Sequence, residues 1–80
     1  GLDISPDGYS VVVTGFSSDH VRVFNAAAYE EKARIKVGEG SAHTAFLPDS
    51  RTAFVGCSIS DHLAVIDIES ETCTELLRLN

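Results

Sequence analysis

Short apolar runs alternate with polar turn residues along the whole chain. The clearest runs are VVVTGF, VRVFN, ARIKV, AFVGCS, LAVIDIE and TELLRL, which begin at residues 11, 21, 33, 53, 63 and 74. β-Branched and aromatic side chains dominate these runs, which is typical of strands. We predict eight strands, near residues 2–5, 10–15, 20–25, 32–37, 44–47, 52–57, 62–68 and 73–79.

The second half of the pattern repeats the first. SSDHVRVFN at residues 17–25 returns as ISDHLAVID at residues 59–67, an offset of 42. At this offset, without gaps, the apolar positions stay in phase and seven of 38 overlapping pairs are identical. A period in the forties indicates stacked units of several strands each. The identical pairs are Pro6 and Pro48, Asp7 and Asp49, Val13 and Val55, Ser18 and Ser60, Asp19 and Asp61, His20 and His62, and Val23 and Val65.

One segment that is predicted to contain a strand is also compatible with a helix. AAAYEEKARIKV at residues 26–37 contains good helix formers. Its counterpart in the second unit, IESETCTELLRL, has threonine and cysteine where a helix disfavours them. The shared register therefore favours a turn followed by a strand in both units. A helix over 27–37 would contradict the equivalence of the two units.

Four strands in about 42 residues, joined by short loops, match the blade of a β-propeller. The predicted fold is all-β: a β-propeller fragment of two consecutive four-stranded antiparallel blades. Residues 1–42 form blade one with its connecting loop, and residues 43–80 form blade two. SPDG at residues 5–8 is a favourable turn, and Ser50 in place of Gly8 makes the equivalent turn less regular.

Composition and net charge limit the classes of partner that the chain can bind. The net charge of −6 and the pI of about 4.7 argue against a nucleic-acid partner, because there is no basic surface to meet phosphates. No apolar run approaches the roughly 20 residues of a membrane span. The chain has no methionine and opens on GLDISPDG, as expected of a segment from within a longer protein. We expect its partners to be neighbouring propeller blades.

The sequence resembles the YVTN-type β-propeller repeat over its whole length, twice. The resemblance rests on the SPDG turn, on the polar loop that ends in Asp19, and on VFN at 23–25 and VID at 65–67. VVTG at 12–15 and FVGC at 54–57 stand where the family has the Tyr-Val-Thr-Asn tetrapeptide after which it is named. A WD repeat fits less well, because the chain has no tryptophan and no Gly-His pair before each blade.

This resemblance implies a non-catalytic binding or interaction scaffold, with a periplasmic, cell-surface or secreted location. A protein or small-molecule ligand would then bind on the face formed by the loops after the second and fourth strands of each blade. An enzyme is the less favoured interpretation. In that alternative the chain is a fragment of a redox propeller, similar to haem d1 nitrite reductase or nitrous oxide reductase, and helps to hold haem or copper at the channel rim.

Two Asp-His pairs, Asp19-His20 and Asp61-His62, occupy the same position in both units. Histidines on one face could bind a metal. We favour a structural loop role instead, because scaffold features repeat whereas a unique site need not. Neighbouring strand residues also point to opposite faces, so Ser18, Asp19 and His20 cannot converge as a catalytic triad.

His43 is the candidate ligand or metal-binding residue. Its counterpart is Gly1, so it is not part of the repeated scaffold. It is predicted to open an innermost strand at the rim of the channel, whereas His20 and His62 should lie too far from the axis to assist it. SAHTAF at residues 41–46 also resembles segments that supply rim histidines in the redox propellers. Other ligands would have to come from other blades.

Cys57 and Cys73 are predicted not to form a disulfide. The third strand of blade two lies between their strands, which separates them by about 9–10 Å. A disulfide requires Cα atoms within about 7 Å.

Overall fold

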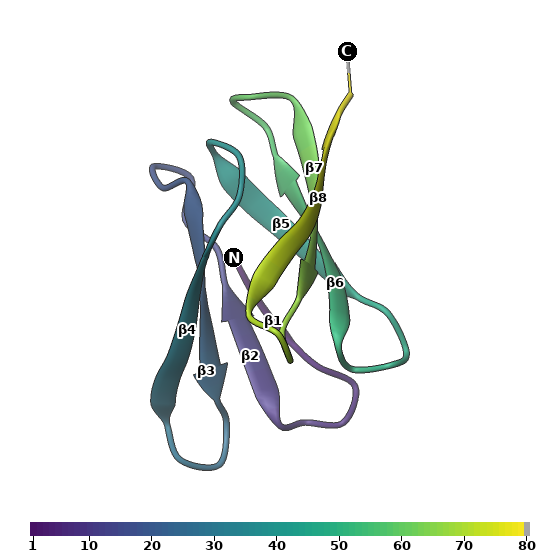
Figure 1. Cartoon of the computed structure of the whole chain (residues 1–80). Helices are drawn as coiled ribbons and strands as arrows, with labels where there is room; N and C mark the ends of the chain where they lie inside the picture. The colour runs from purple at the N-terminus through teal and green to yellow at the C-terminus, as the bar shows by residue number, and fades with distance from the viewer. Residues whose placement is uncertain (80) are drawn as a thin grey trace.

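The computed structural model describes residues 1–79, which form eight strands in two four-stranded antiparallel sheets (Figure 1). Sheet one runs in the order β1-β2-β3-β4 and sheet two in the order β5-β6-β7-β8. The predicted all-β fold of two blades is confirmed. Among the described residues, no helix is long and apolar enough to cross a membrane. The strands are β1 (Leu2–Ile4), β2 (Ser10–Val13), β3 (His20–Asn25), β4 (Glu30–Lys36), β5 (Ser41–Phe46), β6 (Thr52–Cys57), β7 (His62–Asp67) and β8 (Thr72–Arg78).

The eight strands correspond to those predicted, with shifts at their ends. β5 begins at Ser41, three residues before the predicted start at residue 44. β4 occupies Glu30–Lys36, so the segment that also admitted a helix is a strand. The register of the two sheets repeats at the same offset of 42. Val12 pairs with Val23 in sheet one, and Phe54 pairs with Val65 in sheet two.

The tight turns repeat as well. Gly8 and its counterpart Ser50 both adopt positive φ, at 79° and 57°. Glycine adopts this conformation without a steric penalty, and serine does not. An aspartate bonds the backbone in both turns: Oδ1 of Asp7 accepts from the N–H of Tyr9 at 3.0 Å, and Oδ1 of Asp49 accepts from the N–H groups of Arg51 and Thr52 at 3.0 and 2.9 Å. The second turn therefore keeps the conformation of the first, although Ser50 replaces Gly8.

The hydrophobic core lies between the two sheets. Blade one contributes five buried side chains and blade two contributes six, and together they form one cluster. Strict alternation along β3 and β6 sends one set of side chains into this cluster and the other set away from it. The buried residues are Val12, Val21, Val23, Ile35, Val37, Ala53, Val55, Cys57, Ala64, Ile66 and Ile68.

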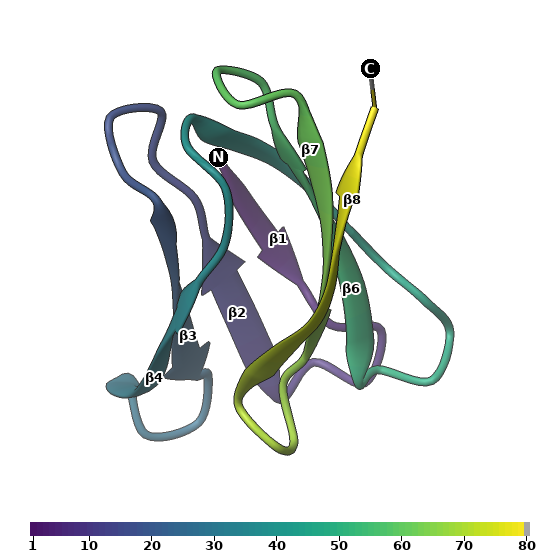
Figure 2. The same ribbon diagram turned by 45° about the horizontal axis from the view of Figure 1, so that its top comes forward.

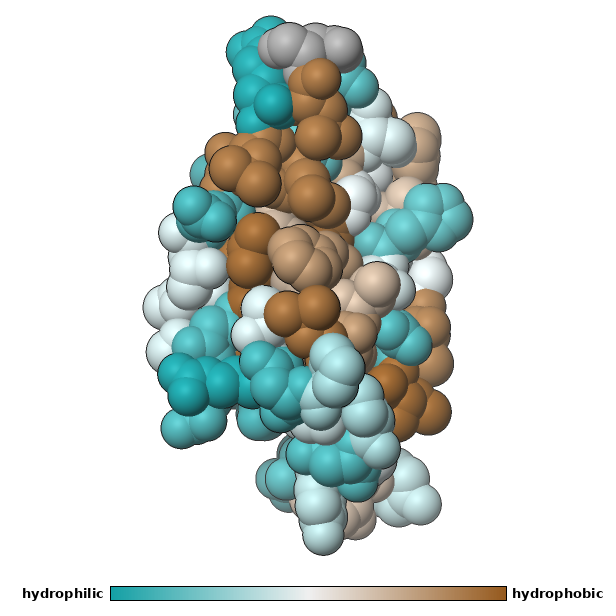
Figure 3. All heavy atoms as spheres, turned by 90° about the vertical axis from the view of Figure 1, so that its right-hand side faces the viewer, coloured by the Kyte–Doolittle hydropathy of each residue, from teal (hydrophilic) through white to brown (hydrophobic). Residues whose placement is uncertain are grey.

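Each sheet also has a face that the other sheet does not cover. We call the open face of sheet two the trailing face, and Figure 3 shows it as a brown apolar patch. The open face of sheet one is the leading face, and it carries arginines as well as apolar side chains. The trailing face comprises Phe54, Leu63, Val65, Leu77 and Leu79, and the leading face comprises Val13, Arg22, Phe24 and Arg34.

Acid is expected to destabilise the fold through Asp67. Arg51 donates two hydrogen bonds to Asp67, at 3.0 and 2.9 Å, and holds the pKa of this carboxyl well below its usual range. A depressed folded-state pKa adds stability at neutral pH that is lost as the pH falls below the unfolded-state value near 4. We expect the melting midpoint of Asp67→Asn to lie below that of the natural chain at pH 7, and the difference to shrink progressively as the pH falls below about 4. Glu30→Gln, at an exposed position in β4, should leave the pH profile unchanged, and a gap that stays constant would refute the Asp67 assignment.

Cys57 and Cys73 are both free thiols, as predicted. Cys57 is buried in the core and Cys73 is half-buried, and burial raises the pKa of both thiols. The thiolate is the reactive form, and the reagent must also reach the sulfur atom. Because Cys57 is buried in the core and Cys73 is only half-buried, an aromatic disulfide reagent should modify Cys57 about tenfold or more slowly than Cys73 in the folded protein. Two thiols should react after denaturation without reductant. Equal rates in the folded state would contradict the buried position of Cys57.

Candidate functional site

Three loops gather at one end of the molecule. They are residues 14–19 between β2 and β3, residues 37–40 between β4 and β5, and residues 58–61 between β6 and β7. Figure 2 shows them together at the top, at the same end as the N-terminus, while the other turns lie at the bottom. This arrangement follows from the antiparallel order of both sheets. It confirms the predicted grouping of these loops on one face.

The connector between the sheets is bonded closely to the β6–β7 loop. The carbonyl oxygen of Gly40 accepts hydrogen bonds from the N–H of Ser58 at 3.1 Å and from its hydroxyl at 3.3 Å. The carbonyl oxygen of Glu39 accepts from the N–H groups of Ile59 and Ser60 at 3.2 and 3.3 Å. The hydroxyl of Ser60 accepts from the N–H of Glu39 at 3.1 Å. These five bonds tie the connector to blade two.

The start of β5, directly after the connector, is bonded to blade one. Ser41 is completely buried, and its hydroxyl accepts from the N–H of Gly15 and donates to the carbonyl of the same residue, both at 3.2 Å. The hydroxyl of Thr14 lies 3.2 Å from the carbonyl oxygen of Ala42, to which it donates. The loops of both blades are therefore held in one arrangement by bonds that cross the blade boundary.

A cleft of about 330 Å³ lies between these loops. Phe16 and Ile59 are 62% and 54% exposed, and they supply its apolar surface. Asp19 and Glu39 supply two carboxylates. The cleft combines groups from both blades and from the connector, namely Phe16, Ser17, Ser18, Asp19, Glu39, Gly40 and Ile59.

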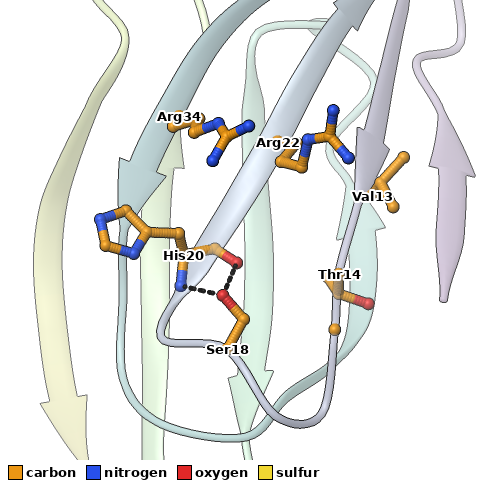
Figure 4. Close-up of a pocket in the computed structure, with 7 residues that line it drawn as sticks. Val13, Thr14, Ser18, His20, Arg22 and Arg34 are labelled. Atoms are coloured by element: carbon orange, nitrogen blue, oxygen red, sulfur yellow. Dashed lines mark hydrogen bonds between the residues drawn. The ribbon is translucent and has the colours of Figure 1, made fainter.

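The two Asp-His pairs have repeated backbone roles. The carbonyl oxygens of Asp19 and Asp61 accept from the N–H groups of Val37 and Leu79, at 2.7 and 2.8 Å, which are equivalent bonds in the two blades. Asp19 also lies 2.6 Å from Nδ1 of His20. Figure 4 shows the Ser18 hydroxyl between the backbone N and O of His20, which lie 3.0 and 3.3 Å away.

His43 and His62 line one pocket. His43 is an exposed residue of β5 that pairs with Gly56, and the pocket beside it has a volume of about 280 Å³. His62 lines the same pocket. Nδ1 of His62 is buried and has no hydrogen-bond partner within residues 1–79. Over the same residues, no group of three or more His, Cys, Asp or Glu side chains is arranged to hold a metal ion.

Several residues of the site were not singled out from the sequence. GEGS at residues 38–41 was interpreted only as a connector, yet Ser41 supplies bonds that join the blades. The signal was the pair of glycines around Glu39, which permits a close backbone approach. An added Cβ at Gly38 would lie 2.9 Å from Cβ of Cys57, and one at Gly40 would lie 2.9 Å from the backbone N of Ile59.

Two sheets of the same register, stacked on a shared core with their connecting loops at one end, define a β-propeller fragment. The chain matches the family described as Lactonase, 7-bladed beta-propeller, over residues 2–80, and it belongs to that family. The propeller resemblance is thereby confirmed, while the more specific assignment to YVTN repeats stays a prediction.

Among solved structures, the chain is similar to Kuenenia stuttgartiensis hydrazine synthase, with a TM-score of 0.93 and 22% sequence identity. The match covers 99% of this chain and 22% of that chain, so the chain spans about a fifth of that protein's length. No curated protein matches the chain. At this level of identity the similarity concerns the fold.

Proposed function

We propose that the chain supplies two consecutive blades of a seven-bladed propeller and presents a binding cleft at its loop end. The observation that carries this proposal is the set of hydrogen bonds that join the loops. Ser41 and Ala42 of β5 are bonded to Gly15 and Thr14 of blade one, and the connector residues Glu39 and Gly40 are bonded to the β6–β7 loop. A cleft held in one shape before binding loses less conformational freedom when a ligand binds. Binding residues are commonly carried by loops on such a rigid scaffold.

The chemistry of the cleft indicates the class of ligand. Phe16 and Ile59 offer apolar surface, and Asp19 and Glu39 offer negative charge, while no Lys or Arg lines the cleft among the described residues. Such a combination suits an amine or guanidinium joined to an apolar group. A lysine or arginine side chain of a partner protein, or a small hydrophobic amine, has this chemistry.

Nuclear magnetic resonance with two matched probes tests the proposal. We expect 4-phenylbutylamine to shift the amide signals of Phe16, Asp19, Glu39 and Ile59, and 4-phenylbutyrate, which has the opposite charge, to leave them in place. Glu39→Gln should weaken the shifts, whereas Glu71→Gln, at the opposite end of the molecule, should not. Equal shifts with both probes, or none with either, would reject the proposed ligand class.

The family name refers to lactones, and hydrolysis would be an activity of the whole protein. General acid–base hydrolysis requires an acid and a base held together at the substrate. Of the two carboxylates at the cleft, Asp19 is bonded to His20. We therefore propose that this chain contributes a binding surface and two blades to the whole propeller.

The redox alternative is favoured by one observation, the shared pocket of His43 and His62. Two imidazoles beside Cys57 and Leu79 do not by themselves fit a haem or copper centre, and we assign no redox step to these residues. In this alternative His43 supplies one donor and other blades supply the rest, since neutral imidazole is a good ligand for copper and iron.

His43→Ala in the full-length protein tests this alternative. If His43 binds a metal or a cofactor, the variant should lose metal content or change the cofactor's absorption spectrum. His20→Ala serves as the control, because His20 lines a different pocket. Unchanged metal content and spectrum in His43→Ala would leave His43 as a strand residue without a ligand role.

A further inference from the structure

The repeat allows corresponding faces of the two sheets to be compared residue by residue. Val55 and Ala64 lie on the face of sheet two that packs against sheet one, where both are fully buried. Their counterparts 42 residues earlier are Val13 and Arg22, on the leading face. The buried seam between the sheets therefore shows how a preceding blade would cover the leading face.

The leading face differs from its buried counterpart by two charges. Arg22 stands where sheet two has Ala64, and Arg34 stands where sheet two has Leu76. The two arginines are cross-strand partners on β3 and β4. Figure 4 shows both guanidinium groups beside a pocket of about 370 Å³, to which Ser18 and His20 also belong.

One carboxylate serves both arginines. Glu31 accepts a hydrogen bond from Nε of Arg22 and another, of 3.0 Å, from Nε of Arg34. Within residues 1–79, the terminal nitrogens of both guanidinium groups have no hydrogen-bond acceptor. The guanidinium of Arg22 also lies 4.9 Å from the ring centre of Phe24. The cluster has two positive charges and one negative charge.

Docking of a blade would remove water from this cluster. Arg22 is now 48% exposed, whereas Ala64 at the equivalent position is completely covered. Arg34 corresponds to Leu76, which is 47% exposed, and so would stay near the outer rim of the seam. A buried guanidinium is tolerated only when its charge and its N–H donors are paired.

We propose that the leading face docks a preceding propeller blade that presents an aspartate or glutamate to Arg22 and Arg34. This proposal rests on membership of the chain in a closed ring. A carboxylate would complete the charge balance and accept bidentate hydrogen bonds from the free nitrogens. Glu75, which pairs with Val65, shows that such blades can carry a carboxylate on the corresponding face.

Charge reversal in the full-length propeller tests the charged seam. Arg22→Glu should lower the melting midpoint by about 5–10 °C, because it breaks a buried ion pair. Lys32→Glu, at an exposed position of β4 outside the pocket, should change the midpoint by no more than about 1 °C. Replacing the partner carboxylate with lysine should restore at least half of the loss. A midpoint of Arg22→Glu equal to that of the natural protein, or failure of every acidic position on the outer strands of the preceding blade to restore it, would refute the proposal.

A milder variant keeps the test decisive if charge reversal prevents folding. Arg22→Lys retains the charge, and a carbodiimide then couples the amine at position 22 to a carboxylate within reach. We expect mass spectrometry to find this cross-link to an Asp or Glu of the preceding blade, and a cross-link to Glu31 alone would overturn the proposal. Small-angle X-ray scattering of the natural protein tests ring closure separately, so failure of the ring is distinguished from failure of the charged seam.

Discussion

Replacing Ile66 by alanine is expected to lower the free energy of unfolding by about 2–5 kcal/mol. Ile66 lies in β7 and is completely buried in the cluster between the two sheets. Truncation removes apolar contact and leaves a cavity that the surrounding strands can fill only in part. Because few other side chains of this size are fully buried, a single cavity removes a large share of the packing between the blades.

Urea unfolding of Ile66→Ala and Leu79→Ala measures this effect with a matched control. Leu79 is 62% exposed on the trailing face, so its replacement in the 80-residue chain should change stability by no more than about 0.5 kcal/mol. In the closed ring, where another blade would cover Leu79, the same replacement should become clearly destabilising. Equal losses for Ile66 and Leu79 in the isolated chain would contradict the position of the core.

The second large effect is expected in the connector, at Gly40. Its φ of 75° lies in the left-handed region, and an added Cβ would lie 2.9 Å from the backbone N of Ile59. Gly40→Ala should therefore combine backbone strain with a clash against backbone, which cannot move aside as a side chain can. We expect a loss of about 2–4 kcal/mol and loosening of the loops around the cleft.

Gly8→Ala separates the two contributions. Gly8 has a similar φ of 79°, but no atom lies within 4 Å of an added Cβ. Its replacement should cost about 1 kcal/mol, the conformational part alone. Thermal unfolding of both variants gives the comparison. A loss at Gly8 as large as that at Gly40 would show that the close approach of the connector to Ile59 does not matter.

The fold could be predicted from the sequence because its signals repeat. Strand pairing in sheet one and in sheet two follows the same offset of 42. The strand predicted from an apolar run in one unit was therefore supported by the equivalent run in the other unit. The segment at 26–37 illustrates this. Its own residues favour a helix, and only comparison with the β8 segment indicated the strand that the structure contains. A single blade would not have resolved that conflict between local propensity and register.

The site was less predictable, because it depends on contacts between segments far apart in sequence. Ser41 bonds to Gly15 across 26 residues, and no local pattern announces such a contact. His62 was assigned to the scaffold because it repeats, and repetition says nothing about which pocket a side chain lines. The exchange of Ala64 for Arg22 was visible in the aligned units, but its meaning required knowing which face of the sheet each residue occupies.

Cross-strand nuclear Overhauser effects test the central claim, that the chain consists of two equivalent consecutive blades. We predict matched pairs of contacts offset by 42 residues: between Val12 and Val23 and between Phe54 and Val65, and likewise between Val21 and Ile35 and between Leu63 and Leu77. Sequential amide contacts typical of a helix over residues 27–37, or a register that differs between the two sheets, would contradict it.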